Sequence, residues 1–168
     1  GSMALSRLRP IWPAFTLFAS GAMLAAAVLY FQGYLNLQPC PLCLQQRYWH
    51  WAVVGVSVVA LIVTRIRPAW TSWAIVIIGL VLLGSAAMGA YHVAVEQKWV
   101  VAQCDVGGAL DPSQLLLSDL PAGELRPPRC DEIAWSWLGI SMAGYNAIIS
   151  LLLALASFAV AWAPERKT

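Results

Sequence analysis

Residues 68–95 read PAWTSWAIVIIGLVLLGSAAMGAYHVAV, a stretch without a single Asp, Glu, Lys or Arg. A helix needs about 20 apolar residues to cross the roughly 30 Å hydrocarbon core of a bilayer, so this stretch can supply one complete span. Three other charge-free stretches can each supply another, at 10–46, 48–64 and 133–164. The pattern predicts a membrane protein whose chain crosses the bilayer four times.

The composition agrees with this prediction. Of the 168 residues, 60% are hydrophobic and 11% are charged, whereas a soluble domain has about 25% charged residues. Four spans leave too little chain for a second folded unit, so we expect one domain at 3–168, preceded by a tag remnant at 1–2. The net charge is +2 and the basic residues form no run, which excludes the usual signature of a nucleic-acid partner.

We therefore expect an all-α fold, a polytopic four-helix bundle with spans at about 12–31, 42–64, 72–93 and 138–162. Two outer loops follow from these spans, at about 32–41 and 94–137. Within the second loop, Asp111 and Pro112 are suited to begin a short leucine-rich helix. That helix would lie on the membrane surface, or equally its leucines would pack on the bundle.

The distribution of basic residues predicts the orientation. Six of the ten Lys and Arg residues fall in segments on one side of the bundle. Loops rich in Lys and Arg stay on the cytoplasmic side, so we expect both termini in the cytoplasm and the two loops outside. The six are Arg7, Arg9, Arg65, Arg67, Arg166 and Lys167.

All four cysteines fall on the predicted outer side: Cys40, Cys43, Cys104 and Cys130. Disulfides persist in oxidising compartments such as the bacterial periplasm, and four cysteines allow three pairings. A bond between Cys40 and Cys43 would close too short a loop to restrain much chain, which favours redox chemistry over a structural staple. A metal site is not expected, because Cys104 and Cys130 do not form the second close-spaced pair that zinc usually requires.

Cys43 begins the second predicted span, and Arg47 and His50 lie four and seven residues further along. These spacings place all three side chains on one helical face. A helix N-terminus and a nearby arginine both favour a thiolate. The alternative is that Arg47 extends its charged head to the lipid headgroups, but the thiol on the same face favours a functional role.

Together these features resemble the DsbB family of bacterial inner-membrane disulfide-forming oxidases. A CxxC motif alone is weak evidence, but its combination with four spans, a following arginine and a separated second-loop pair is specific and covers nearly the whole chain. The family also commonly has an acid immediately before the arginine. This chain has Gln45 and Gln46 there, so a proton route through such an acid loses its support. The matching segments are Phe31-Gln32, Pro39 to Cys43 with Arg47, Cys104-Asp105, and Cys130 followed by Trp137-Leu138-Gly139 and Met142.

The resemblance implies a multi-pass protein of the bacterial inner membrane that reoxidises a DsbA-like periplasmic partner and passes two electrons to a membrane quinone, either ubiquinone or menaquinone. It also implies resting disulfides between Cys40 and Cys43 and between Cys104 and Cys130. Cys104 would be attacked by the partner, Cys130 would pass electrons to Cys40, and Cys43 would face the quinone. The implied quinone-binding residues are Arg47 and, near it, His92. His50 is added as a candidate because it lies on the same helical face as Cys43 and Arg47.

Two alternatives remain at this point. A vitamin K epoxide reductase-like enzyme also combines four helices, loop cysteines and a quinone, but its CxxC motif follows the loop pair, whereas here it comes first. A non-enzymatic four-span protein with two structural disulfides is the alternative from another functional class.

Overall fold

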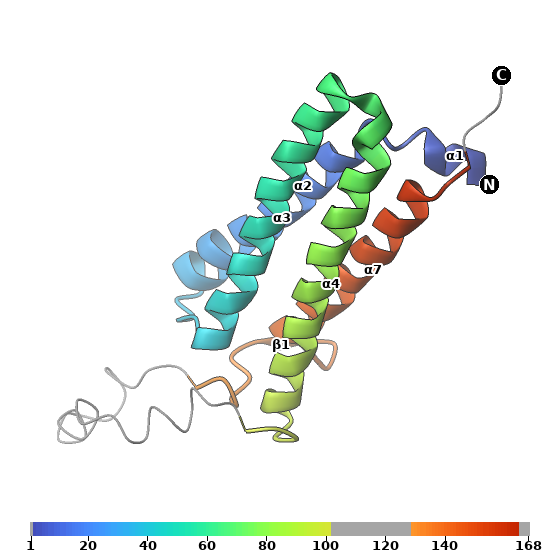
Figure 1. Ribbon diagram of the computed structural model, residues 1–168. Helices are drawn as coiled ribbons and strands as arrows, with labels where there is room; N and C mark the ends of the chain where they lie inside the picture. The colour runs from blue at the N-terminus through green and yellow to red at the C-terminus, as the bar shows by residue number, and fades with distance from the viewer. Residues whose placement is uncertain (1, 102–128, 165–168) are drawn as a thin grey trace, which may run out of the picture.

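The structure, a computed structural model, describes residues 2–101 and 129–164 (Figure 1). Cys104, the short helix expected after Asp111, and the last two basic residues lie outside this part of the chain. Within it the all-α bundle is confirmed. The elements in chain order are α1 (Ser2–Ser6), α2 (Trp12–Ala25), the π-helix η1 (Ala26–Tyr34), α3 (Pro41–Ile66), the 3₁₀-helix η2 (Pro68–Trp70), α4 (Thr71–Glu96), β1 (Ser136–Trp137), β2 (Ile140–Ser141) and α7 (Met142–Ala161).

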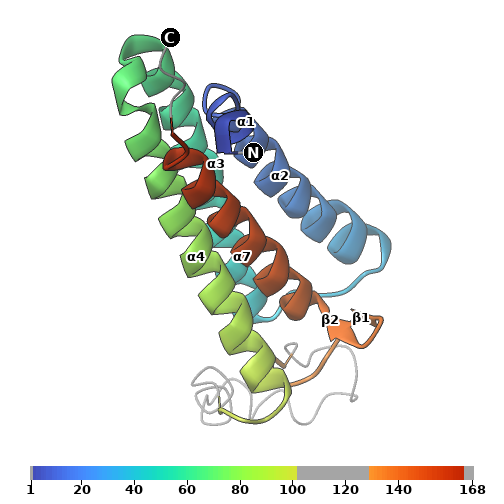
Figure 2. The same cartoon turned by 90° about the vertical axis from the view of Figure 1, so that its right-hand side faces the viewer.

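Four helical segments of the described chain are long and apolar enough to cross a membrane: Trp12–Tyr34, Pro41–Ile66, Pro68–Glu96 and Met142–Ala161. The turn between α3 and α4 lies at the same end of the bundle as both ends of the described chain (Figures 1 and 2). At this end Arg9 Nε donates to the carbonyl of Val160, 3.0 Å away, near the end of α7. The segments leading into α3 and α7 therefore meet at the opposite end.

Apolar and small polar side chains share the interior of the bundle. One buried cluster joins α3, α4 and α7 and consists of Val53, Ala60, Ile78, Leu82 and Ala154. Because lipid is as apolar as such side chains, close packing and interhelical hydrogen bonds hold membrane helices together. Three such bonds are Thr16 Oγ1 to Ser57 Oγ at 2.8 Å, Trp12 Nε1 to Ser157 Oγ at 2.9 Å, and Ser85 Oγ to Ser150 Oγ at 3.0 Å.

At Gly89 the backbone of α4 lies close against the backbone of α7. A Cβ on Gly89 would lie 2.9 Å from the backbone nitrogen of Ala147 and 3.1 Å from the carbonyl oxygen of Ala143. Gly89→Ala should therefore push the helices apart and destabilise the protein by about 1–3 kcal/mol, measured by thermal unfolding in detergent. Gly55→Ala is the matched control, since no atom lies within 4 Å of that Cβ, and an equal loss in both variants would contradict the prediction.

The last span begins later than the expected 138, because a small hairpin precedes it. Leu138 and Gly139 have φ values of 55° and 78° and connect β1 to β2 as a two-residue type I′ turn. Helix α7 then starts at Met142, where the side chain of Ser141 accepts a hydrogen bond from the backbone nitrogen of Gly144 at 3.2 Å. The charge-free stretch at 133–164 includes both the hairpin and the helix, so the absence of charge alone could not separate the two elements.

Candidate functional site

The Cys-Pro-Leu-Cys segment forms the beginning of α3. Cys40 is the N-cap, and its sulfur accepts a hydrogen bond from the backbone nitrogen of Cys43 at 3.4 Å. Pro41 occupies the first helical position, where its missing N–H costs nothing and its fixed φ suits a helix. The cap and first turn bring the Cys40 and Cys43 sulfurs to 3.2 Å, so only a small movement separates this dithiol from a disulfide.

The two thiols have different electrostatic surroundings. The S–H bond that Cys40 donates to Cys43, together with burial, raises the pKa of Cys40 to about 12. Cys43 accepts that bond and lies in the first turn of α3, where the helix dipole stabilises an anion. A single negative charge on the pair is therefore best placed on Cys43.

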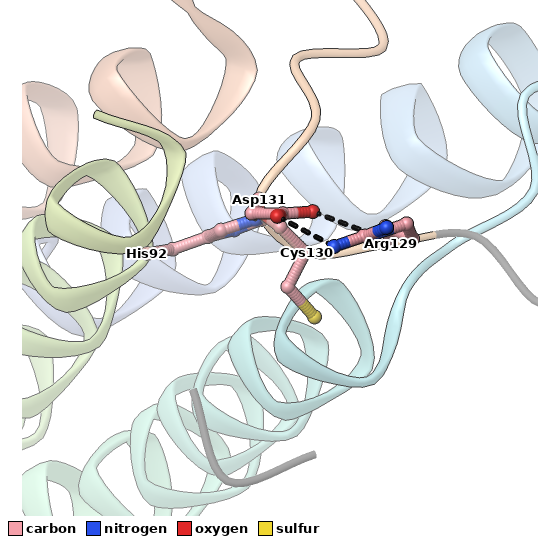
Figure 3. Close-up of polar contacts among 4 residues, drawn as sticks. All are labelled: His92, Arg129, Cys130 and Asp131. Carbon is pink, nitrogen blue, oxygen red and sulfur yellow. Dashed lines mark hydrogen bonds and ion pairs between the residues drawn. The ribbon is translucent and has the colours of Figure 1, made fainter. Parts of the chain in front are cut away.

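Cys130 is fully buried beside this pair. It shares one cluster with Cys40, Leu42 and Val95, against which Cys43 also packs. Figure 3 shows His92 directed from α4 toward Cys130, and its Nε2 lies 3.2 Å from the Cys130 carbonyl oxygen and 3.7 Å from the Cys40 sulfur. The second outer segment is thus positioned against the first.

Arg47 extends across to the first span. Its Nη1 donates to Gln32 Oε1 at 2.9 Å and its Nη2 to the carbonyl of Ala27 at 3.3 Å. Both acceptors belong to η1, the π-helix that carries the first span on to Tyr34, and π-helical turns are frequent at functional sites. The guanidinium is therefore bound inside the protein instead of extended to the lipid headgroups. Two of its five N–H groups make these bonds, which leaves donors for a ligand.

One cavity of about 400 Å³ brings the candidate side chains together. Its polar lining includes Cys40, Cys43, Arg47, His50 and His92, while Cys130 lies behind the Cys40 wall. Apolar and aromatic side chains form much of the remaining wall, among them Leu24, Phe31, Trp135, Trp137, Met142 and Ile149. Apolar walls with a few fixed polar groups are typical of small-molecule sites, and this cavity suits a flat, apolar ring with hydrogen-bond acceptors.

The family model for the disulfide bond formation protein DsbB matches residues 9–160, nearly the whole chain. The chain belongs to the DsbB family. It is 35% identical over 147 residues to disulfide bond formation protein B of Azoarcus sp. (strain BH72), covering 83% of this chain and 84% of that protein. It is 33% identical over 160 residues to the protein of the same description from Albidiferax ferrireducens, covering 89% and 85%. No solved structure matches.

The DsbB fold places His50 differently from the other candidates. Its side chain is buried, with Nδ1 3.2 Å from Ser20 Oγ and Nε2 2.5 Å from Asn146 Oδ1. Both ring nitrogens thus have protein partners, although the ring borders the cavity. The geometry favours a role for His50 in the interior hydrogen bonds over direct contact with a ligand.

Several polar residues that line this cavity were not predicted as site residues from the sequence, among them Gln46, Glu96 and Asn146. Glu96 ends α4 and accepts a hydrogen bond from Ser141 Oγ at 2.8 Å, so a carboxylate does border the cavity even though none precedes Arg47. Asn146 carried a usable signal, because it is the one carboxamide in an otherwise apolar span. Gln46 was noted only as a departure from the family pattern.

Proposed function

We propose that this protein is a thiol:quinone oxidoreductase that reoxidises a DsbA-like dithiol partner and passes two electrons to a membrane quinone. Membership of the DsbB family makes it a multi-pass, disulfide-forming membrane protein. The observation that supports the finer proposal is a largely apolar cavity lined by both cysteines of the CxxC pair and by Arg47, with Cys130 buried next to Cys40.

Electrons would enter through the second-loop disulfide. A partner thiolate attacks Cys104, which forms a mixed disulfide and releases Cys130 as a thiolate. Cys130 attacks Cys40, so the Cys40–Cys43 bond breaks and Cys43 leaves with the electron pair. The partner's second thiol then releases Cys104, which attacks Cys130 and frees Cys40. The partner ends as a disulfide, the Cys104–Cys130 bond is restored, and the Cys40–Cys43 dithiol holds two electrons.

Arg47 and Cys43 are the residues best placed at the quinone ring. A bound quinone supplies an acceptor for two electrons and two protons. The unengaged donors of Arg47 can bind a ring carbonyl, and the aromatic wall around Trp135 and Phe31 can exclude water from the ring. Cys43, the preferred site of charge in the pair, lies on the same wall as Arg47 one helical turn away.

The direction of transfer follows from reduction potentials. The disulfide/dithiol couple of a DsbA-type partner has a high reduction potential, about −120 mV. Only a more oxidising acceptor can therefore take electrons from its dithiol. A gap of about 30 mV is enough for a tenfold preference in a two-electron exchange. Two cysteine pairs also separate the water-facing partner from the lipid-facing quinone.

The direct test is anaerobic mixing of the purified protein with reduced DsbA and a water-soluble quinone analogue, followed by quinone absorbance. We expect one quinone to be reduced for each partner dithiol oxidised, with Cys43→Ser as the inactive blank. If the partner remains reduced while the protein is folded and its cysteines are oxidised, the proposal is wrong.

The orientation in the membrane stays a prediction, with both termini in the cytoplasm and the cysteines in the periplasm. Cys130 is fully buried, so single cysteines at exposed positions are better probes in a protein whose native cysteines are replaced by Ser. In intact cells a membrane-impermeant thiol reagent should label Ser136→Cys at once, but should label Arg67→Cys only after permeabilisation. The reverse pattern would show that the bundle is inserted the other way.

A further inference from the structure

A line of hydrogen bonds runs from the middle of the bundle to the cysteine pair. His50 Nε2 is 2.5 Å from Asn146 Oδ1, Asn146 Nδ2 donates to Gln46 Oε1 at 2.9 Å, and Gln46 Nε2 is 2.7 Å from His92 Nδ1. All four side chains are buried and they come from α3, α4 and α7. The line ends at Cys40, the neighbour of His92 Nε2.

Two backbone carbonyls determine the direction of these bonds, because a carbonyl oxygen can only accept. Gln46 Nε2 lies 3.2 Å from the carbonyl of Leu42, so this atom must be the amide nitrogen and its second hydrogen points at His92 Nδ1. His92 Nε2 lies 3.2 Å from the carbonyl of Cys130, so this nitrogen must carry a hydrogen. Both ends therefore require the same imidazole, with Nδ1 accepting and Nε2 donating.

We propose that Gln46, oriented by Asn146 and His50, holds His92 as the neutral tautomer with its hydrogen on Nε2, where it donates to the Cys130 carbonyl and to the Cys40 sulfur. His92 is then a catalytic residue that contacts a reacting sulfur. Gln46, Asn146 and His50 are positioning residues that act through His92.

The two carboxamides orient His92 and do not conduct protons to it. An amide passes a proton only through an unfavourable imidic-acid form, so Gln46 and Asn146 interrupt any proton path between the two histidines. Their value is geometric, because each presents a donor on one side and an acceptor on the other. Every donor in the line consequently points toward Cys40.

The consequence for Cys40 rests on the proposed function. When Cys104 attacks Cys130 in the interloop disulfide, a Cys104–Cys130 bond forms, the Cys40–Cys130 bond breaks, and Cys40 leaves with the electron pair. A neutral N–H of His92 beside Cys40 stabilises that thiolate without adding a charge to the cavity. The same ring anchors the Cys130 backbone, so one residue aligns both sulfurs of this exchange.

The tautomer can be read directly, without a partner or quinone. The chain has only two histidines, so ¹⁵N-histidine labelling of the intact protein gives two imidazole spectra, and a His50→Phe sample assigns them. We expect His92 to show an unprotonated Nδ1 and a protonated Nε2. A protonated Nδ1 in the parent protein would overturn the proposal.

Gln46→Glu should change this spectrum in a defined way. A carboxylate only accepts, so residue 46 would require a hydrogen on Nδ1 while the Cys130 carbonyl still requires one on Nε2, and both nitrogens become protonated. Gln45→Glu is the matched control, since Gln45 is exposed one position away and should leave His92 unchanged. Similar spectra for the two variants would contradict the proposal. If Gln46→Glu does not fold, Gln46→Met is the substitute. Methionine donates no hydrogen bond, so the ¹⁵N signal of His92 Nδ1 should move toward that of a nitrogen that accepts none. An unshifted signal would also contradict the proposal.

The link to Cys40 has a separate readout, the equilibrium of the Cys40–Cys43 pair with dithiothreitol. In the reduced pair the negative charge lies on Cys43, whose sulfur is within 4.8 Å of a His92 ring nitrogen. A positive charge on His92 at that distance favours the thiolate, so Gln46→Glu should shift the pair toward the dithiol on the order of tenfold, or about 30 mV. A shift no larger than that of Gln45→Glu would remove His92 from Cys40 chemistry. If the parent instead shows the expected tautomer and fails to oxidise reduced DsbA, the proposed function falls and the tautomer assignment stands.

Discussion

Cys130→Ser should stop electron flow from a DsbA-like partner to the Cys40–Cys43 pair and lower quinone reduction at least about a thousandfold, as removal of a reacting nucleophile usually does. Cys130 is fully buried in the cluster that contains Cys40, so no solvent-borne thiol can easily take its place. A serine oxygen fits there but cannot form a disulfide. Steady-state reduction of a water-soluble quinone analogue measures the effect.

The same variant should also accumulate a covalent complex. Cys104 keeps its thiol but loses its resolving neighbour, so a mixed disulfide with a partner that retains only its attacking cysteine should persist. Peptide mapping should place that bond on Cys104. Ser136→Ala is the control, because it changes an exposed side chain in the same segment and should keep the parent turnover. Turnover of Cys130→Ser within tenfold of the parent would exclude Cys130 as the relay.

The four spans could be predicted because the bilayer restricts the sequence so strongly. A spanning segment must form all of its backbone hydrogen bonds internally, as a helix does, and must present apolar side chains to the lipid. Long charge-free apolar stretches are therefore a reliable sign of spanning helices. The hairpin before α7 was not predictable in this way. Its turn residues, Leu138 and Gly139, carry no Asn-Gly signal, and no charged residue separates its strands from the helix that follows.

The site divides along similar lines. The spacing of Cys43, Arg47 and His50 on one helical face was readable from the sequence, and all three side chains do border one cavity. The partners of these residues were not readable. Arg47 donates to the π-helix η1, and no local sequence pattern predicted that this segment is a π-helix. Gln46 accepts a hydrogen bond from Asn146, which lies 100 residues further along the chain. Such contacts depend on how the helices pack, which periodicity does not determine.

Gln46 shows why a departure from a family pattern is informative once its surroundings are known. From sequence alone, Gln46 only removed an acid from the position before Arg47. In the structure it donates to the Leu42 carbonyl and to His92, and it accepts from Asn146. A carboxylate cannot make the first two bonds. The glutamine therefore requires an unprotonated Nδ1 on His92, whereas a glutamate at this position would require a protonated one.

Arg47→Lys should weaken quinone binding while leaving the exchange between partner and Cys104 nearly unchanged. The guanidinium donates to Gln32 and Ala27 and still has N–H groups for a ring carbonyl. Lysine keeps the charge but lacks the planar fork of donors. It therefore cannot make the hydrogen bonds to η1 and bind a ligand at the same time. One lost charge-assisted hydrogen bond is worth roughly 1.5–3 kcal/mol. The Michaelis constant for quinone should accordingly rise on the order of tenfold to a hundredfold, provided that it follows binding.

Two measurements on Arg47→Lys separate this role from a general effect of charge. Arg65→Lys is the matched control, because it makes the same change at an exposed position near the other end of α3 and should leave the quinone kinetics unaltered. Stopped-flow oxidation of reduced partner by quinone-free protein should also be the same in Arg47→Lys and the parent, since that exchange begins at Cys104 in the other loop. An arginine that only extends to lipid headgroups predicts no change, because lysine extends equally well. If Arg47→Lys matched the parent at every quinone concentration, Arg47 would be a structural link between α3 and η1, and Cys43 would remain the residue that faces the quinone.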